Sequence, residues 1–144
     1  MLELFQKTIS KQVEFKGIGL HSGQESIVKI LPAPENYGII FISTDLDKNN
    51  TIRASFENVS SAKLCTTIQN NFNVSISTIE HLLAAIYITG IDNALIEISA
   101  SEVPIMDGSS KEFVETISAV GVTDQNSKRK YLKILKKFDF TEDK

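Results

Sequence analysis

The segment over residues 77–90 constrains the fold more than any other part of the sequence. Its apolar residues recur at intervals of three and four, which is the spacing of one helix face, at Ile79, Leu82, Leu83 and Ile86. Ser77 and Glu80 stand three residues apart, as in a capping box, and Gly90 suits the C-terminal cap. The sequence therefore predicts an amphipathic helix here, with one face packed on a core.

Strand-like segments precede this helix. They alternate apolar and polar residues and are separated by turn residues, over 12–15, 25–31, 38–43, 51–56, 65–69 and 74–76. A further strand is predicted over 91–99, and a second helix begins near Ser109 and ends at Gly121. Because both helices come after most of the strands, the sequence predicts an α+β two-layer sandwich, with two helices packed on one face of a mainly antiparallel sheet.

Charge divides the chain into two unequal parts. Residues 124–144 hold 7 of the 15 Lys and Arg residues but only 4 of the 18 Asp and Glu residues, so the preceding part is acidic. An acidic body argues against nucleic acid as a partner, because phosphate neutralisation needs clustered basic residues. We expect a first domain over 1–123, a linker over 124–130 and the start of a truncated second domain over 131–144, in which 131–140 resembles a strand. A solvated basic linker is the alternative.

Composition sets further limits on the class of protein. A chain of 144 residues that is 42% hydrophobic can bury a core of its own. No transmembrane segment or signal peptide is recognisable, and the single cysteine, Cys65, cannot form an internal disulfide, so we expect a cytoplasmic protein. No phosphate-binding loop or dinucleotide fingerprint occurs, which leaves nucleotide hydrolysis and nicotinamide chemistry without support.

The predicted helix also carries the residues best suited to chemistry. On a helical wheel, His81 lies nearly opposite the apolar stripe, on a second face with Ala84, Ala85 and Ile88. Such a face suits contact with another domain or a ligand. An imidazole that binds a metal beside a carboxylate that acts as a base is the arrangement of zinc hydrolases, with Glu80 as the base. The structural alternatives are an ordinary hydrogen-bonded or surface imidazole and a glutamate that only caps the helix.

Few other residues offer ligands or support for such a site. His21 lies in a glycine-rich turn, Cys65 is typical of a small buried hydrophobe, and Asp107 lies in a turn before the second helix. We take His21, Thr78 and Asp107 as residues that either brace a site from outside or serve only the fold. The chain has two histidines, so a complete three-ligand zinc site within it is not expected.

Five ordered motifs resemble one known family. They are GIGLHSG over 17–23, LCTT over 64–67, ISTIEHLLAAI over 76–86, GIDNALIEI over 90–98 and VPIMDGSS over 103–110. In this order they are similar to the first domain of the UDP-3-O-acyl-N-acetylglucosamine deacetylases, the zinc enzymes of lipid A synthesis in Gram-negative bacteria. The resemblance covers nearly the whole chain.

The resemblance implies both an activity and roles for particular residues. The family hydrolyses the acetamide of a UDP-linked, 3-O-acylated glucosamine, at a site between two similar α+β sandwiches. By position, His81 matches its first zinc ligand, Glu80 its general base, and Leu64 and Cys65 a segment that lines the substrate site. The remaining zinc ligands and a histidine proton donor belong to the family's second domain, and their motifs do not occur here.

The resemblance therefore implies a first-domain part of a zinc enzyme that is inactive alone and prone to self-association through the face of the predicted helix. Two other readings stay open on the residues themselves. One is a non-catalytic α+β binding or regulatory domain that docks a partner on that helix face. The other, a small self-sufficient metallohydrolase, conflicts with the number of ligands.

Overall fold

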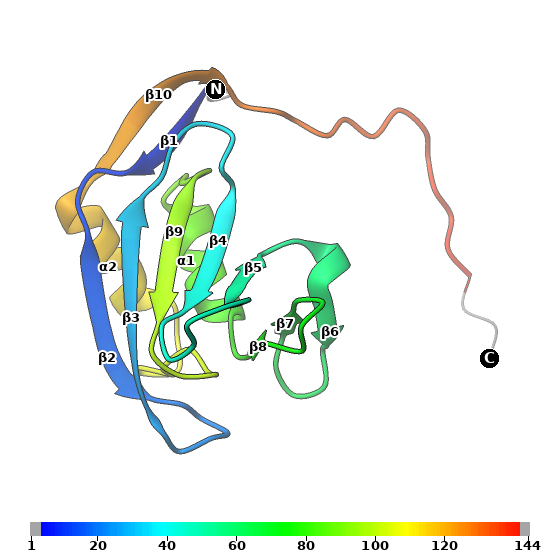
Figure 1. Cartoon of the computed structure of the whole chain (residues 1–144). Coiled ribbons are helices and arrows are strands. Elements are labelled where there is room, and N and C mark those ends of the chain that lie inside the picture. Colours follow the sequence, from blue (N-terminus) through cyan, green and yellow to red (C-terminus); the bar gives the residue numbers. More distant parts are fainter. Residues whose placement is uncertain (1–3, 142–144) are drawn as a thin grey trace.

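A five-stranded sheet forms the centre of the fold in the computed structural model, which describes residues 4–141 (Figure 1). Its strand order is β2 (Val13–Ile18), β3 (Glu25–Pro32), β9 (Ala94–Ile98), β4 (Ile39–Ser43) and β5 (Thr51–Arg53). Neighbours run antiparallel, except that β4 and β9 are parallel. Side chains along β3 alternate between the two faces of the sheet. Val28 and Ile30 are buried on one face, whereas Lys29 on the other face pairs with Glu14 of β2. The sheet thus has one apolar face to cover.

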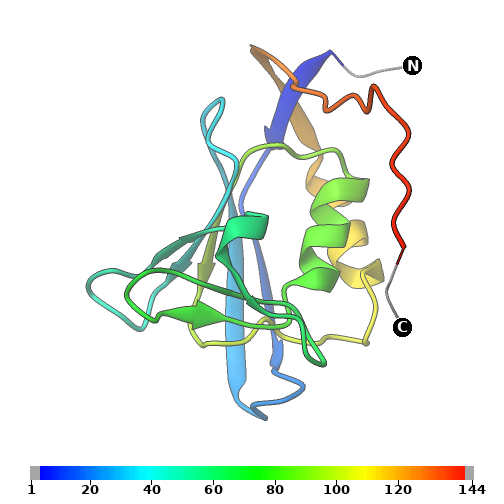
Figure 2. The same cartoon turned by 90° about the vertical axis from the view of Figure 1, so that its right-hand side faces the viewer.

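Two helices cover that face. α1 (Glu80–Ile88) and α2 (Lys111–Val120) lie side by side on the same side of the sheet, as Figure 2 shows. Phe113 of α2 packs edge-on against Phe15 of β2 with ring centroids 4.8 Å apart, and both side chains are buried. The predicted α+β two-layer sandwich, with two helices on one face of a mainly antiparallel sheet, is confirmed.

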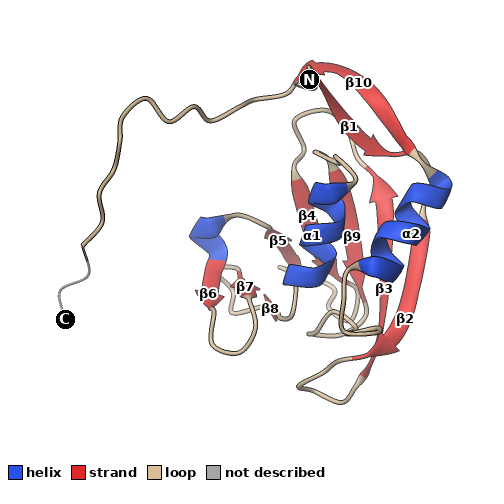
Figure 3. Cartoon of the chain, turned by 180° about the vertical axis from the view of Figure 1, so that it is seen from behind, coloured by secondary structure: helices blue, strands red, loops and turns tan. Residues whose placement is uncertain are grey.

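Two small sheets flank the central one (Figure 3). One joins β6 (Val59–Ser61), β7 (Thr67–Gln69) and β8 (Ser75–Ile76), and it follows a single 3-10 turn over Phe56–Asn58. The other pairs β1 (Phe5–Ile9) with β10 (Val122–Lys128), two strands from opposite ends of the described chain. Neither α1 nor α2, the two α-helices within residues 4–141, has the length and hydrophobicity needed to cross a membrane.

The predicted capping box at the start of the first helix is wrong. α1 begins at Glu80, its N-cap is Ile79, and no side chain caps it. The Ser77 hydroxyl instead donates to the carbonyl oxygen of Ser101, because residues 77 and 102 form a β-bridge that holds Ser77 outside the helix. Gly90 does follow the helix with φ +77°, the left-handed conformation expected just after a helix end.

The prediction that Ala85 lies on the second helix face is wrong, because Ala85 is fully buried in the core. The buried residues of α1 are Leu82, Ala85 and Ile86, whereas Leu83 is only half-buried, so the buried side of the helix is turned toward Ala85. Ala84 is half-buried and Ile88 is exposed, so the second face consists of His81, Ala84 and Ile88. These three residues are spaced by three and four, and we call this surface the His81 face.

Residues 124–128, predicted as part of a linker, belong to strand β10. The polar composition concealed the strand, because β10 pairs with β1 at a sheet edge where most of its side chains face solvent. Conversely, residues 131–140, which resemble a strand in the sequence, form no strand in the structure. The division into domains stays a prediction.

Candidate active site

Glu80 is the first residue of α1 and is fixed by a neighbouring loop. Its carboxylate accepts a hydrogen bond of 3.1 Å from the backbone N–H of Thr66, which directly precedes β7. The backbone N–H of Ile79 donates in return to the carbonyl oxygen of Thr66 at 3.4 Å. A carboxylate at a helix N-terminus is also stabilised by the helix dipole. The side chain is half-buried and so has one oriented oxygen and remaining acceptor capacity toward solvent.

His81 follows Glu80 and has an imidazole without hydrogen-bond partners among the described residues. Its Nδ1 is buried and unpaired, which is uncommon for a buried polar atom, whereas the residue as a whole is half-buried. The ordinary hydrogen-bonded imidazole, one of the alternatives raised by the sequence, is therefore not what the structure shows. An imidazole free of protein partners is available to bind a ligand or a metal.

The backbone turns sharply just before the Glu80–His81 pair. Thr78 is buried and has φ +57°, a left-handed conformation that is strained for a β-branched residue. Its hydroxyl donates to a carboxylate oxygen of Glu102 at 2.8 Å. Flanking backbone hydrogen bonds join Ser77 to Ser101 and Val103 at 2.9 and 3.1 Å. The strained residue is thus held by contacts on both sides, and it sets the direction in which α1 starts.

Glu102 ties this turn to the glycine-rich loop over residues 17–23. It is 2% exposed, and its carboxylate accepts backbone N–H groups from His21 at 3.0 Å and from Ser22 at 2.7 Å, besides the Thr78 hydroxyl. Burial by itself would raise the pKa of Glu102, but the hydrogen bonds from Ser22, His21 and Thr78 outweigh it and lower the pKa to about 2. Glu102 is therefore a buried carboxylate that stays ionised.

Glu102 is a residue of this cluster that the sequence did not reveal. The available signal was a glutamate between a strand and the apolar pair Val103–Pro104, a place where a charge must have partners if it is buried. His21 takes part through its backbone N–H, and its side chain is exposed. Gly19 is required at this junction, because a Cβ there would overlap the Ser22 hydroxyl and the Glu102 carboxylate. His21 and Thr78 thus both meet the carboxylate that lies behind the Glu80–His81 pair.

Leu64 and Cys65 lie next to Thr66, the residue that binds Glu80. Leu64 is 84% exposed and has φ +67°, an unusual state for a large apolar residue. Cys65 is half-buried, with Sγ 3.8 Å from the Thr67 hydroxyl, so its description as a buried hydrophobe is wrong. Both residues lie in the loop that connects β6 and β7 of the small sheet. Leu64 thus exposes an apolar side chain two residues before Thr66, whose N–H binds Glu80.

Asp107 lies apart from this cluster. Its carboxylate accepts the backbone N–H and the hydroxyl of Ser109 at 2.9 and 2.8 Å, and these bonds lower its pKa. The predicted turn before the second helix is therefore present, although the N-cap of α2 is Ser110, whose side chain makes no cap. No hydrogen bond joins Asp107 to Glu80 or His81 in the described part of the chain, and its contacts are those within the turn at Ser109.

Fold and site together define an α+β domain that presents a fixed carboxylate beside a free imidazole at the start of one helix. The chain belongs to the LpxC family, UDP-3-O-acyl N-acetylglycosamine deacetylase, whose sequence model matches residues 6–144. It is 47% identical over 131 residues to the UDP-3-O-acyl-N-acetylglucosamine deacetylase of Shewanella woodyi and 46% identical to that of Shewanella oneidensis. Each alignment covers 91% of this chain and 43% of the relative, so the chain spans less than half of their length.

Proposed function

We propose that this chain forms one half of the active site of a zinc-dependent deacetylase that acts on UDP-3-O-acyl-N-acetylglucosamine in lipid A biosynthesis. The observation that carries the proposal is the pair at the start of α1, a carboxylate held by the Thr66 N–H next to an imidazole whose buried Nδ1 has no partner within the described chain. The names of the relatives supply the substrate. The lone cysteine is in keeping with a cytoplasmic enzyme.

The described residues are suited to supply one of the ligands of a zinc ion. No three His, Cys, Asp or Glu side chains come together to hold a metal within residues 4–141, so we assign His81 as one ligand and expect the rest from outside the described residues. We propose that they belong to a second domain that begins in 131–144. The pairing of β10 with β1 favours a domain boundary after Lys128 over one at residue 123.

Each residue has a defined task in this mechanism. Zinc, when bound, acidifies water and polarises a carbonyl group. The Glu80 carboxylate accepts the proton that the attacking water loses. The hydrogen bond from the Thr66 N–H orients this carboxylate. Leu64 and Cys65 line the approach to Glu80 and contact the substrate. Glu102 touches no reacting group and acts through the turn at Thr78, which aims the start of α1.

The test is a chimera in which residues 1–128 of this chain are followed by the C-terminal part of the Shewanella oneidensis relative. We expect about one zinc per molecule and deacetylation of UDP-3-O-acyl-N-acetylglucosamine. Glu80→Gln should lower turnover by roughly 100-fold or more, as for loss of a general base, while zinc stays bound. His81→Ala should lower zinc content as well as turnover.

Glu57→Gln is the matched control, because Glu57 is an exposed glutamate outside the site and its replacement should leave both quantities unchanged. The 144-residue chain alone should not turn over substrate. Unchanged turnover in folded His81→Ala chimera would refute the assignment and favour a non-catalytic role for the His81 face.

A further inference from the structure

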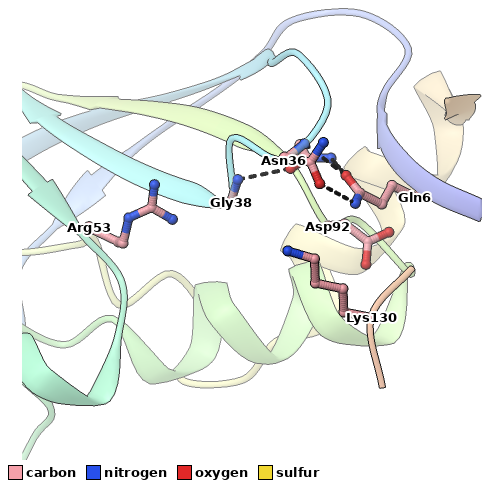
Figure 4. A pocket seen from close by; sticks show the side chains of 7 residues that line it. Gln6, Asn36, Gly38, Arg53, Asp92 and Lys130 are labelled. Atoms are coloured by element: carbon pink, nitrogen blue, oxygen red, sulfur yellow. Dashed lines mark hydrogen bonds between the residues drawn. The ribbon is translucent and has the colours of Figure 1, made fainter. Parts of the chain in front are cut away.

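A polar hollow of about 230 Å³ lies away from the Glu80–His81 pair (Figure 4). It is bordered by Arg53 at the end of β5, Gly38 before β4, Asp92 after α1 and Lys130 after β10. Asp92 follows the C-terminal end of α1, whereas Glu80 is at its beginning. Nine helical residues, about 13 Å, separate these ends. The hollow is therefore distinct from the candidate active site.

Two cations, Arg53 and Lys130, face the hollow without side-chain partners among residues 4–141. Figure 4 shows the side chains of Arg53 and Lys130 reaching toward it from opposite sides. Neither side chain makes a hydrogen bond or an ion pair with any residue in the described range, in contrast to Lys16 and Lys29, which pair with glutamates across the sheet. Two uncompensated positive charges at one hollow favour an anion there.

The single carboxylate at this hollow is already neutralised. The Asp92 carboxylate accepts hydrogen bonds from Nε of Arg129 at 2.7 Å and from Nη2 of Arg129 at 2.6 Å. It also accepts a hydrogen bond from the backbone N–H of Lys7 at 2.8 Å. This two-point contact is the strong geometry for an arginine–carboxylate pair. It also fixes the backbone beside Lys130. Among the residues that the structure describes, no acidic side chain at this hollow is therefore left to offset the charges of Arg53 and Lys130.

The amides beneath the hollow bind one another and leave the cations free. Asn93 donates to Gln6 at 2.8 Å and accepts the Gly38 N–H at 2.8 Å, and Gln6 donates to Asn36 at 2.9 Å. These groups are mutually satisfied, so the surface is preorganised. A Cβ at Gly38 would lie only 2.6 Å from Nη1 of Arg53, so the absence of a side chain there lets the guanidinium sit against the backbone.

We propose that this hollow binds the phosphate group of a small soluble phosphorylated compound. A guanidinium presents two parallel N–H groups that match phosphate oxygens, and the lysine ammonium supplies the second charge of a dianion. The hollow is smaller than the 300–1,000 Å³ of sites for drug-sized ligands, which fits a phosphate with a small substituent. The site does not depend on the proposed deacetylase activity.

The test is a titration of the ¹⁵N-labelled 144-residue chain with inorganic phosphate, at low ionic strength and mildly alkaline pH. We expect saturable shifts confined to the signals of Gly38, the Arg53 side chain and the Lys130 amide. Arg53→Gln and Lys130→Gln should each weaken binding about tenfold or more, the effect of losing a charged hydrogen bond. Lys48→Gln is the matched control, an equal charge change at an exposed residue of the β4–β5 loop.

Arg53→Gln and Lys130→Gln each replace an exposed side chain, and unchanged dispersion of the remaining NMR signals would show that the fold is retained. Shifts that rise without saturation, or that weaken equally in Lys48→Gln, would overturn the proposal because they indicate general screening. Acetate serves as a carboxylate probe, and equal affinity for acetate would refute phosphate as the ligand class. A chain that sediments with phosphatidic acid vesicles but shows no saturation by phosphate would refute a soluble ligand.

Discussion

Glu102 shows how one buried charge can organise residues distant in sequence. Its carboxylate joins His21 and Ser22, some 80 positions earlier, to Thr78, 24 positions earlier. A buried ion is costly unless several donors meet it, and here three residues do. The loop and the start of α1 therefore depend on one ionised side chain.

Replacement of Glu102 by Gln should destabilise the protein in a pH-dependent way. The folded-state pKa of about 2 lies below the value of 4.5 for an unperturbed glutamate, so ionised Glu102 stabilises the fold above the unfolded pKa. This contribution is lost as pH falls from about 4.5 toward 2. At pH 7 we expect Glu102→Gln to lower the free energy of unfolding by about 2–3 kcal/mol, measured by urea denaturation.

The difference between wild type and Glu102→Gln should shrink on acidification through that window. Glu57→Gln, at an exposed position, should change stability by less than about 0.5 kcal/mol at either pH. A difference that stayed constant from pH 7 to pH 2 would show that Glu102 is not the ionised group described here.

The elements of this fold differ in how far their sequences reveal them. α1, α2 and the central strands carry their own periodicity, because each buries one face against the core. β1 and β10 could not be recognised, since their pairing joins residues more than 100 positions apart and most β10 side chains face solvent. The adjacency of Glu80 and His81 is visible in the sequence, but the contacts from Thr66 and Glu102 that fix their surroundings are tertiary.

Gly19→Ala tests whether the glycine-rich loop and the start of α1 act as one unit. The added Cβ would overlap Ser22 and Glu102 and should displace the loop from the carboxylate. We expect a loss of about 1–3 kcal/mol of stability, as for overpacking, and faster hydrogen exchange at the amides of His21 and Ser22.

Gly23→Ala is the comparison, because Gly23 has φ +65° but open space around its Cβ position. It should show only the backbone cost of about 1 kcal/mol and leave exchange at His21 protected. Equal exchange at the His21 amide in the two variants would show that the overlap with Glu102 does not govern the loop.

At the scale of the whole molecule, exposed apolar side chains occur on α1 and in the segment after β10. Ile88 on the His81 face is 66% exposed and Tyr87 beside it is 86% exposed. The segment after β10 adds Leu132, Leu135, Phe138 and Phe140, each at least 80% exposed. Exposed apolar surface on this scale marks an interaction site. In the proposed enzyme, the second domain would cover the His81 face.

The 144-residue chain should consequently self-associate through the His81 face. Ile88→Glu places a charge on this face and should lower the association constant about tenfold or more, since burying an isoleucine side chain contributes roughly 1.5–3 kcal/mol. Sedimentation velocity over a concentration series measures this change.

Leu46→Glu, at an exposed leucine of the β4–β5 loop, is the matched control and should leave association unchanged. An equal fall in both variants would attribute association to added net charge, and no fall in Ile88→Glu would place the contact elsewhere, on the segment after β10.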